Sequence, residues 1–399
     1  MSSAINYHRA LPATADVAII GGGIIGAATA FWAARAGLRA VVIEREAALC
    51  TLTTAAASGG FRLQHEDRDD WSLVRESLAT VLHFAEVTGQ RDYDPAVVPR
   101  GYLWLTTDPA MLAHHRELVA RQQRWGQTDV ELLDGAEVRR RFPFISEWVI
   151  GGRFRAGDGT FDQKALAFGL AAASRVPVAT NCAVTGFRQA SGRLVGVITT
   201  RGTVATETVV LVAGPYSGAL AATLGLVLPL VNSRRQKIIL PDVPEVPAWA
   251  PMTLDDDTGT HWRPALRGAY MLGAIGEPQI EPATTEVPLD HRLALRLLDP
   301  SSPHAAARIA PFWATVWARG AGHWSLQAGQ YTLTPDNKPL IGPSDMPGLW
   351  LNTGYGGHGA MQGLAGSARL LEMITGARAI EGNPFHPARI FAGGMSRPL

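Results

Sequence analysis

The chain has 399 residues, of which 47% are hydrophobic, and a formal net charge of +1 at neutral pH. This length suits two or three domains, and so small a net charge argues against a surface for nucleic acid or for anionic membranes. The two cysteines, Cys50 and Cys182, show no CxxC spacing, and His114 and His115 are adjacent on a predicted charged helix, where we expect both to face solvent. The sequence therefore predicts neither a disulfide scaffold nor a metal site, and a cytoplasmic location is the default.

The first predicted unit is a strand, a glycine turn, a helix and a second strand, and the rest of the chain is organised around it. Residues 17–20 are a continuous apolar run, residues 21–26 fit the spacing GxGxxG, residues 27–36 suit a helix of small side chains, and residues 40–43 suit a buried strand. Glu44 follows, 18 residues after the last glycine of the motif, where a carboxylate can accept hydrogen bonds from a ribose. This order predicts a dinucleotide site.

Each glycine of the motif has a physical role at such a site. Gly21 allows a tight turn, Gly23 lets the backbone approach a pyrophosphate, and Gly26 lets the helix pack close to the strand. The N-terminus of the helix then turns free N–H groups and a positive dipole toward the phosphates. A glycine-rich turn in another α/β fold is the alternative. Residues 17–34 also lack charge, as a membrane span or a signal peptide would, but the glycines suit a turn and no basic segment directly precedes them.

The remaining pattern alternates helices, strands and loops. We expect residues 1–15 to be disordered, and residues 45–70, rich in small side chains, to form a loop where the backbone approaches a ligand. Residues 130–145 suit a short strand, a short helix and a break at proline, and residues 240–251 a Pro-rich loop. In chain order, the other predicted elements are a helix over 70–88, a strand over 101–107, a helix capped by Asp108 and running to about 125, a helix over 162–175, several short strands over 176–215 with a hairpin at Ser191-Gly192, two antiparallel strands over 260–277 with a turn at Arg267-Gly268, helices over 289–299 and 303–319, a strand over 349–353 and a helix over 360–375.

The last strand and helix are joined by a second glycine loop, in which Gly354, Gly356 and Gly359 also fit GxGxxG. Because no acid ends a following strand, we do not expect a second dinucleotide here. The helix N-terminus could instead stabilise negative charge on a ring or a carbonyl oxygen, and a plain strand–helix turn is the alternative. With a single dinucleotide fingerprint, no separate NAD(P)H site is evident, so we expect electrons to enter from an organic substrate.

In their order, these motifs resemble the FAD-dependent amino acid and amine oxidoreductases that include glycine oxidase, sarcosine oxidase and D-amino acid oxidase. The likeness spans nearly the whole chain and rests on the N-terminal motif with Glu44 and on the segments TTAAASGG, LDGAEVRRRFPF, DGTFDQKALAFGLAAA, CAVTGF, VVLVAGPYSG, TPDNKPLIGP and GYGGHGAMQG…PFHPARI. It implies an α/β fold with two interleaved domains. These are a discontinuous Rossmann-like FAD-binding domain over 1–90, 150–228 and 330–399, and an α+β substrate domain built on an antiparallel sheet over 91–149 and 229–329.

The resemblance also implies how FAD is held. The N-terminal turn would meet the pyrophosphate, Glu44 would meet the adenosine ribose, and Arg45 would lie beside the adenine, with which Val184 would pair through its backbone. The start of the last helix would lie under the N1–C2 edge of the flavin, where reduction places negative charge. The implied FAD contacts are Gly21, Gly23, Ile24, Ile25, Gly26, Glu44, Arg45, Thr53, Thr54, Ser58, Gly59, Gly60, Val184, Ala213, Gly214, Gly357, His358, Gly359, Ala360, Met361 and Gln362.

The chain departs from its relatives at two positions that concern the flavin. The Cys that tethers flavin in monomeric sarcosine oxidase corresponds to Gly329, and the His of dimethylglycine dehydrogenases has no counterpart in residues 53–57, so we expect non-covalent, dissociable FAD. A family Lys that assists oxygen reduction corresponds to Met271, a residue that glycine oxidases also lack. The sequence therefore leaves open whether the electron acceptor is O2 or another compound, and so whether the enzyme is an oxidase or a dehydrogenase.

The implied reaction is hydride transfer from a carbon beside an amine to flavin N5, which gives an imine that hydrolyses. Substrate recognition departs from the relatives, because Met361 stands where sarcosine oxidases have a carboxylate-binding Lys, and Tyr331 where glycine oxidases have an Arg. A carboxylate clamp could come instead from Arg62, His261 or Arg263. The last two share one face of a predicted strand. A solvated loop for Arg62 and a structural ion pair for Arg263 are the alternatives.

The missing clamp also admits a larger or cyclic amine as substrate. Its pocket would have aromatic walls, although such residues lie in cores more often than in pockets. A flavin hydroxylase would normally show a GD pair before the last helix, where this chain has GYGGHG, and a non-catalytic FAD-binding or assembly subunit is the other rival. We expect a small-molecule amine or amino acid as partner, and a homo-oligomer is open. The predicted catalytic residues are Arg62, His261, Arg263, Tyr331, Tyr355 and Met361, and the predicted aromatic walls are Trp262, Tyr270, Tyr331 and Tyr355.

Overall fold

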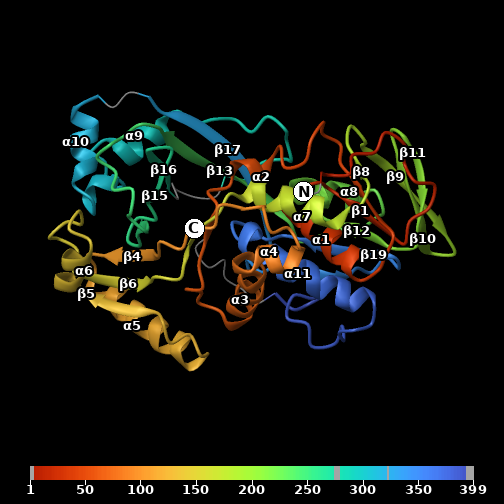
Figure 1. The fold of residues 1–399 in the computed structure, drawn as a ribbon, viewed down its shortest axis with the longest axis horizontal. Coiled ribbons are helices and arrows are strands. Elements are labelled where there is room, and N and C mark those ends of the chain that lie inside the picture. Colours follow the sequence, from red (N-terminus) through yellow and green to blue (C-terminus); the bar gives the residue numbers. More distant parts are fainter. Residues whose placement is uncertain (1–3, 274–278, 321–322, 392–399) are drawn as a thin grey trace.

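The computed structural model describes residues 4–273, 279–320 and 323–391. Two large sheets dominate it, one of six strands in the right-hand half of Figure 1 and one of eight strands that occupies the left-hand half and reaches across the top. The chain passes between the two sheets several times, so each sheet is built from segments distant in sequence. This is the α/β architecture with an antiparallel second part that the sequence predicts.

The six-stranded sheet has the order β18-β19-β12-β1-β2-β8 and is parallel except for β18, which runs antiparallel to β19. Its central strand β1 is buried on both faces, as its unbroken apolar run requires. The first and last predicted units thus meet in one sheet, one strand apart. The strands are β1 (Val17–Ile20), β2 (Ala40–Ile43), β8 (Val178–Ala179), β12 (Val209–Leu211), β18 (Leu340–Pro343) and β19 (Leu349–Thr353).

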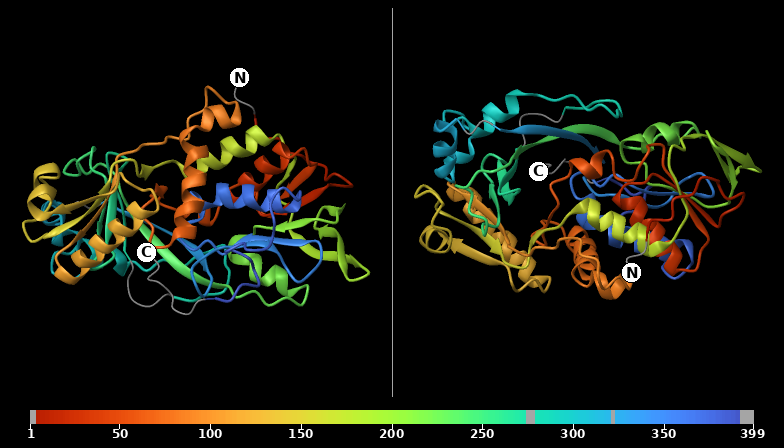
Figure 2. Two further views of the ribbon diagram at one scale, coloured as in Figure 1. Left: turned by 90° about the horizontal axis from the view of Figure 1, so that it is seen from below. Right: turned by 45° about the horizontal axis from the view of Figure 1, so that its top comes forward.

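Alternate side chains of this sheet enter two separate cores. Val17 and Ile19 pack against three helices that lie side by side in Figure 2, with α3 crossing α11. Ala18 and Ile20 pack on the opposite face, under a small antiparallel sheet. The helices are α1 (Ile24–Arg35), α7 (Gln163–Ser174), α11 (Gly359–Ile374) and α3 (Arg68–Leu82), and the small sheet comprises β9 (Val184–Ala190), β10 (Arg193–Thr199) and β11 (Gly202–Ala205).

The eight-stranded sheet has the order β17-β13-β16-β15-β14-β4-β6-β5 and is antiparallel except where β4 pairs with β14. One face packs on short helices through a core that includes Trp262 and Trp313, both fully buried. The strands are β4 (Tyr102–Thr106), β5 (Glu131–Asp134), β6 (Gly151–Arg155), β13 (Val231–Leu240), β14 (Met252–Asp255), β15 (His261–Ala265), β16 (Gly268–Leu272) and β17 (Ser325–Leu333), and the helices beside them are α5 (Pro109–Arg124), α6 (Gly135–Arg141), α9 (Arg292–Leu298) and α10 (Phe312–Ala318).

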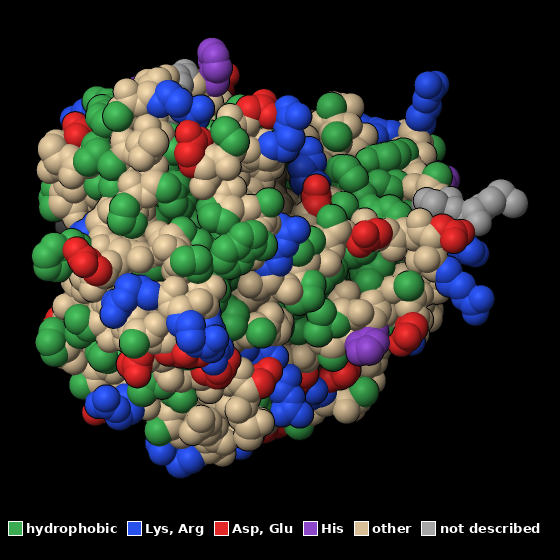
Figure 3. Space-filling view, turned by 60° about the vertical axis from the view of Figure 1, so that its left-hand side comes forward, with side chains coloured by type: hydrophobic (Ala, Val, Ile, Leu, Met, Phe, Trp, Pro, Cys, Tyr) green, Lys and Arg blue, Asp and Glu red, His purple; other side chains and the backbone are tan. Residues whose placement is uncertain are grey.

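Figure 3 shows the end of the molecule that carries this sheet. Acidic and basic side chains are interspersed there with hydrophobic ones, without a field of one sign. Within the described residues, the helices are all too short or too polar to cross a bilayer. The remaining elements are α2 (Thr53–Ala56), α4 (Phe84–Thr88), α8 (Ser217–Ala222), the 3-10 helices η1 (Gly214–Tyr216) and η2 (Ala306–Arg308), and the strand pair β3 (Gly60–Phe61) and β7 (Gly159–Thr160).

Most of the helices and strands predicted from the sequence are confirmed, but several bounds are wrong. Helix α1 begins at Ile24, three residues before the predicted start, because its first turn grows directly out of the glycine motif. The helix predicted over 70–88 is divided at His83, whose backbone leaves the helical region. The helix predicted over 303–319 is η2 followed by α10, because Pro311 has no N–H to continue a helix and instead stands just before α10.

Two further expectations are wrong. Residues 4–15 are not a disordered lead-in, since Tyr7 pairs with Val178 and the N–H of Ala15 donates to the carbonyl of Ala205 at 3.0 Å. His115 does not face solvent but is fully buried, with Nε2 at 2.7 Å from an oxygen of Asp256. The prediction that both histidines face solvent is wrong because α5 directs the side chain of His115 toward the eight-stranded sheet.

The strand pairing also bears on the proposed division into domains. The pairing of β6 with β4 and β5 puts Gly151–Arg155 in the eight-stranded sheet, which moves the boundary expected at 150 to beyond residue 155. Strand β17 continues in that sheet to Leu333, past the boundary expected at 330. Of the paired segment predicted over 260–277, residues 274–277 lie outside the described residues.

Candidate functional site

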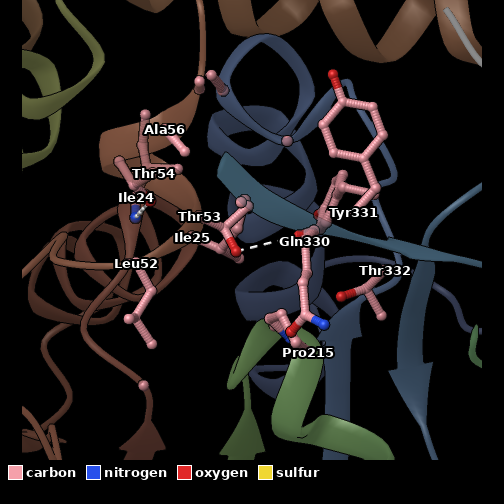
Figure 4. Close-up of a pocket in the computed structure, with 18 of the residues that line it drawn as sticks. Ile24, Ile25, Leu52, Thr53, Thr54, Ala56, Pro215, Gln330, Tyr331 and Thr332 are labelled. Carbon is pink, nitrogen blue, oxygen red and sulfur yellow. Dashed lines mark hydrogen bonds between the residues drawn. The ribbon is translucent and has the colours of Figure 1, made fainter. Parts of the chain in front are cut away.

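A cavity of about 390 Å³ lies where the two sheets meet. The carboxyl end of β1, the N-terminus of α1, the α2 segment and the loop before α11 form one side of it. Strands β4, β13, β15, β16 and β17 of the eight-stranded sheet contribute residues to the other side. Figure 4 shows part of this cavity, with α1 and α2 residues facing those of β17. The cavity therefore joins the two glycine loops that the sequence singles out.

The N-terminal glycines are required by close contacts. Gly21 has φ +119°, and a Cβ there would lie 2.6 Å from the carbonyl oxygen of Val212. A Cβ on Gly26 would lie 1.9 Å from the carbonyl oxygen of Gly21, so α1 can approach the turn only with glycine at this position. Gly23, by contrast, faces the cavity, where a Cβ would meet Thr54 Oγ1 at 3.3 Å. The turn is thus tight at its base and open toward the cavity.

The N-terminus of α1 is free to receive an anion. Gly23 is its N-cap and makes no side-chain cap bond, and its first turn contains no acidic residue. The N–H of Ile24 donates to Thr54 Oγ1 at 3.1 Å, and Thr53 Oγ1 donates to the carbonyl of Gln330 at 3.1 Å, as the dashed lines in Figure 4 show. The proton of the Thr54 hydroxyl is not used in either bond, and this hydroxyl beside a helix N-terminus without an acidic residue suits a phosphate oxygen.

Glu44 and Arg45 lie at one end of the cavity. Glu44 accepts hydrogen bonds from the N–H groups of Gly22 at 2.6 Å and Glu46 at 2.8 Å. Burial raises the pKa of the Glu44 carboxyl, and these two N–H groups act in the opposite direction. The guanidinium of Arg45 stacks on Tyr216 at 3.6 Å from the ring centroid, and its buried Nη2 has no partner among the described residues. Val184, Ala213 and Gly214 line the same end of the cavity.

The second glycine loop faces the cavity from the start of α11. His358 is the N-cap of α11 and makes no side-chain cap bond, and the first turn of α11 is again without an acid. A Cβ on Gly357 would lie 2.8 Å from the ring of Tyr331, so this loop and β17 are in close contact. Gln362 does not line the cavity, and its Nε2 donates instead to Asp70 Oδ1 at 2.9 Å. The side chain of Gln362 is therefore directed to Asp70 rather than into the cavity.

These observations fit a dinucleotide with a charged diphosphate and a ring that becomes anionic. Two helix N-termini without caps, an unpartnered Arg45 nitrogen and the open Gly23 all face one cavity. The predicted contacts that line the cavity are Gly21, Gly23, Ile24, Ile25, Glu44, Arg45, Thr53, Thr54, Ser58, Gly59, Gly60, Val184, Ala213, Gly214, Gly357, His358, Gly359, Ala360 and Met361, and Gly26 lies just behind them.

All but one of the predicted catalytic residues line the cavity. Arg62, His261, Tyr331 and Met361 line the cavity. Tyr355 lines it too, but its hydroxyl donates to Asn352 Oδ1 at 2.5 Å in the interior. Arg263 is not among the lining residues. Its Nε donates to the carbonyl of Ser58 at 2.8 Å, and its guanidinium lies 4.6 Å from the ring centroid of Tyr270. Neither the carboxylate clamp nor the structural ion pair considered for Arg263 describes this arrangement. Trp262, expected as a possible wall, is a fully buried core residue.

Arg62 is a charged residue in the lining of the cavity. It is only 7% exposed, so it is not part of a solvated loop, and its Nη2 lies 3.2 Å from His358 Nε2. Its buried Nε has no partner within the described part of the chain. Burial, and then the charge of Arg62, lowers the pKa of His358 to about 3, and burial lowers the pKa of His261 to about 4. Both histidines are therefore neutral at physiological pH, beside a permanent cation.

Sequence reasoning missed Arg235, Gln236 and Tyr102, which also line the cavity. Arg235 lies on β13, in the segment 231–240 for which no strand is predicted. Its alternation with Ser233 and Lys237 is a two-residue period that could have indicated a strand with one polar face. Nothing local shows that this face meets the cavity, because that depends on the pairing of β13 with β17.

Comparison with known proteins agrees with this site. Residues 16–373 match the family model described as FAD dependent oxidoreductase, and the chain belongs to this family. FAD is accordingly the cofactor of the fold. Glycine oxidase of Pseudomonas putida is 29% identical over 92% of this chain and 96% of its own length. Glycine oxidase from Geobacillus kaustophilus has a similar fold, with a TM-score of 0.80 at 22% identity over 96% of this chain and all of its own.

Other relatives are longer than this chain. Human mitochondrial sarcosine dehydrogenase is 26% identical over 89% of this chain but only 39% of its own length. D-amino acid dehydrogenase of Cereibacter sphaeroides is 32% identical over 65% of this chain and 57% of its own length. The chain thus spans about two fifths to three fifths of these relatives.

Proposed function

We propose that this FAD-dependent oxidoreductase oxidises the C–N bond of a carboxylate-bearing amine or amino acid. The observation that supports this most directly is one cavity in which Arg62 and Tyr331 face two uncapped helix N-termini. When bound, FAD supplies a two-electron acceptor for the hydride on the carbon beside the nitrogen, and water hydrolyses the resulting imine to a carbonyl compound and an amine. The names of the relatives, which act on glycine, sarcosine and D-amino acids, agree with this class of reaction.

Arg62 is the residue we assign to the substrate carboxylate. A guanidinium with an unpartnered buried Nε can form short, charge-assisted hydrogen bonds to a carboxylate. His261 and His358, being neutral, add no second positive charge at this point. Arg263 is better described as a positioning residue, because its bond to Ser58 holds the 58–60 loop against β15.

The same wall favours removal of a proton from the substrate amine. Burial disfavours a charged ammonium, and a nearby guanidinium disfavours it further. An amine that sheds its proton on entry needs no strong base, and the wall offers none: Tyr331 has its phenol pKa raised by burial. Helix α11, with its N-terminus toward the cavity, is suited to stabilise negative charge that develops there.

Rapid mixing without oxygen tests the proposal. Amines and amino acids should bleach the visible flavin band, and Arg62→Gln should lower the bleaching efficiency at least tenfold, because an ion pair within the cavity is lost. Arg116→Gln, on the exposed face of α5, is the matched control and should leave it unchanged. If no amine or amino acid bleaches the band, a non-catalytic FAD-binding subunit is the better account. Bleaching by NADH alone would favour a hydroxylase.

Two finer predictions accompany it. After acid precipitation the yellow colour should stay in the supernatant, because FAD is expected to be dissociable, and a yellow pellet would contradict this. Peroxide formed under air, compared with dye reduction under argon, distinguishes an oxidase from a dehydrogenase.

A further inference from the structure

Two guanidinium groups face the sheet side of the cavity from different segments. Arg62 follows β3, and Arg235 lies on β13, across from Gly329 of β17. Arg235 lies 5.4 Å from the ring centroid of Tyr331, and both cations act electrostatically on the Tyr331 hydroxyl. In Figure 4 the ring of Tyr331 and the side chain of its neighbour Gln330 point in opposite directions. The two arginines and Tyr331 therefore line the cavity together, with Arg235 beside the Tyr331 ring.

Each guanidinium retains hydrogen-bonding capacity. Arg235 donates from Nη1 to Ser233 Oγ at 2.8 Å and to the carbonyl of Arg234 at 3.0 Å. Its Nε, like that of Arg62, is buried and unpartnered among the described residues. The neighbouring cations differ, because Lys237 is bonded to the carbonyl of Ala57 at 2.8 Å and Arg263 to that of Ser58. Among the described cations that line this side of the cavity, Arg62 and Arg235 thus each keep a nitrogen for a ligand, as Arg45 does beside Glu44.

No carboxylate of the described residues compensates them. Of the residues that line the cavity, Glu44 is the one acid, and its oxygens are bonded to backbone N–H groups at the opposite end. Behind the wall, Asp158 is bonded to Arg155 at 2.7 Å and to the N–H of Leu63 at 2.8 Å. The neighbouring histidines are neutral. The wall therefore carries two positive charges with no anion of the protein beside them.

Such an arrangement is costly unless a ligand supplies the opposite charge. A cation that is largely removed from water needs an ionic partner, and a guanidinium binds a carboxylate with two aligned donors. When a bidentate carboxylate pairs with each guanidinium, both cations are compensated, and a ligand with two anionic groups supplies both partners at once.

We propose that the substrate is an amine that carries two carboxylate groups, one held by Arg62 and the other by Arg235. The inference rests on the proposed oxidation of a C–N bond and adds the substrate class. Tyr331 also lines this part of the cavity, and it would contact the part of the ligand between the two carboxylates. The chemistry at carbon and nitrogen is unchanged, so the reaction would balance as before: the hydride carries both electrons to FAD, and the nitrogen gives up a proton as the imine forms.

Matched ligands that do not react test the binding site independently of turnover. Thiodiacetate has sulfur in place of nitrogen and two carboxylates, and (methylthio)acetate lacks one of those carboxylates. By titration calorimetry on the FAD-loaded protein, thiodiacetate should bind at least tenfold more tightly. Arg235→Gln should remove most of this difference, and Arg235→Lys should restore part of it by returning the charge. Equal affinities for the two ligands in the wild-type protein would overturn the proposal.

The corresponding substrates test the same class in the reaction. Iminodiacetate and sarcosine differ by one carboxylate, as do glutamate and norvaline. Anaerobic bleaching should be at least tenfold more efficient for the dicarboxylate of at least one pair. If sarcosine or norvaline bleaches the flavin and neither dicarboxylate is more efficient than its partner, the dicarboxylate inference fails while amine oxidation stands. If no ligand of either pair bleaches it, amine oxidation is in doubt and calorimetry still decides the binding site.

Control variants separate the charge from the fold. Arg234→Gln removes a positive charge from the same strand, but its side chain pairs with Glu281 at 3.3 Å away from the cavity. It should leave the preference for two carboxylates unchanged. Retained visible absorbance of FAD and an unchanged melting temperature confirm that Arg235→Gln is folded. A loss of preference in Arg234→Gln equal to that in Arg235→Gln would contradict a specific role for Arg235.

Discussion

Replacement of Gly26 by alanine tests the tight approach of α1 to the glycine turn. The new Cβ would lie 1.9 Å from the carbonyl oxygen of Gly21. A carbon–oxygen contact needs about 3.3 Å, so the start of the helix must move by roughly 1.4 Å. Gly21 cannot retreat, because it is itself packed against the carbonyl of Val212. Overpacking of this kind costs about 1–3 kcal/mol, and the better helix propensity of alanine offsets about 0.5–1 kcal/mol of it.

The larger effect should be on the cofactor. A shift of this size displaces the N–H groups at the start of α1, and each lost hydrogen bond to a charged group is worth about 1.5–3 kcal/mol. Titration of the apoprotein with FAD should therefore show an affinity reduced about 10- to 100-fold. Gly218→Ala, in α8 with open space at its Cβ, is the matched control. Wild-type FAD affinity and stability in Gly26→Ala would refute the assignment of this turn to the diphosphate.

Two further predictions follow from buried titratable groups. His261 and His358 bind protons in the unfolded chain below about pH 6.5. In the fold, burial lowers their pKa to about 4 and about 3. The free energy of unfolding should thus fall by up to about 1.4 kcal/mol per histidine for each pH unit from 6.5 toward 4. Denaturant unfolding at pH 7, 6 and 5 should show a smaller fall in His358→Gln, and an equal fall would contradict the reasoning. Cys50 and Cys182 are buried, and burial raises the pKa of Cys50 to about 12. Ellman's reagent should therefore modify neither before denaturation and both after it; rapid modification of the native protein would show that the interior is open.

Close spacing in the sequence was enough to locate the cofactor end of the site. The apolar run, the glycines and Glu44 lie within 28 residues, so their relation is fixed by two adjacent strands, one turn and one helix. The loop before α11 is likewise a short glycine segment between a strand and a helix, and the family resemblance predicts that it contacts the same cofactor. Both loops line one cavity, at the carboxyl ends of β1 and β19. Such motifs can be recognised in a sequence because the backbone geometry of a short segment determines where glycine is needed.

Local reasoning was weaker where the tertiary environment sets a residue's role. Arg263 shares a strand face with His261, yet its guanidinium is bonded to Ser58 rather than turned into the cavity. His115 is adjacent to the partly exposed His114 but lies fully buried beside Asp256. Even the turn between β15 and β16 falls at Leu266 and Arg267, and Gly268 is required by its contact with the carbonyl of Leu240.

The sequence by itself determined the family, the cofactor and the two glycine loops that line one cavity, because these depend on contiguous motifs. Tertiary structure alone decided that β13 pairs with β17 and so carries Arg235 to the same wall as Arg62. No periodicity can reveal that meeting, because the two arginines are separated by more than 170 residues and are joined only through sheet pairing. The charge on this side of the cavity is therefore a property of the folded chain.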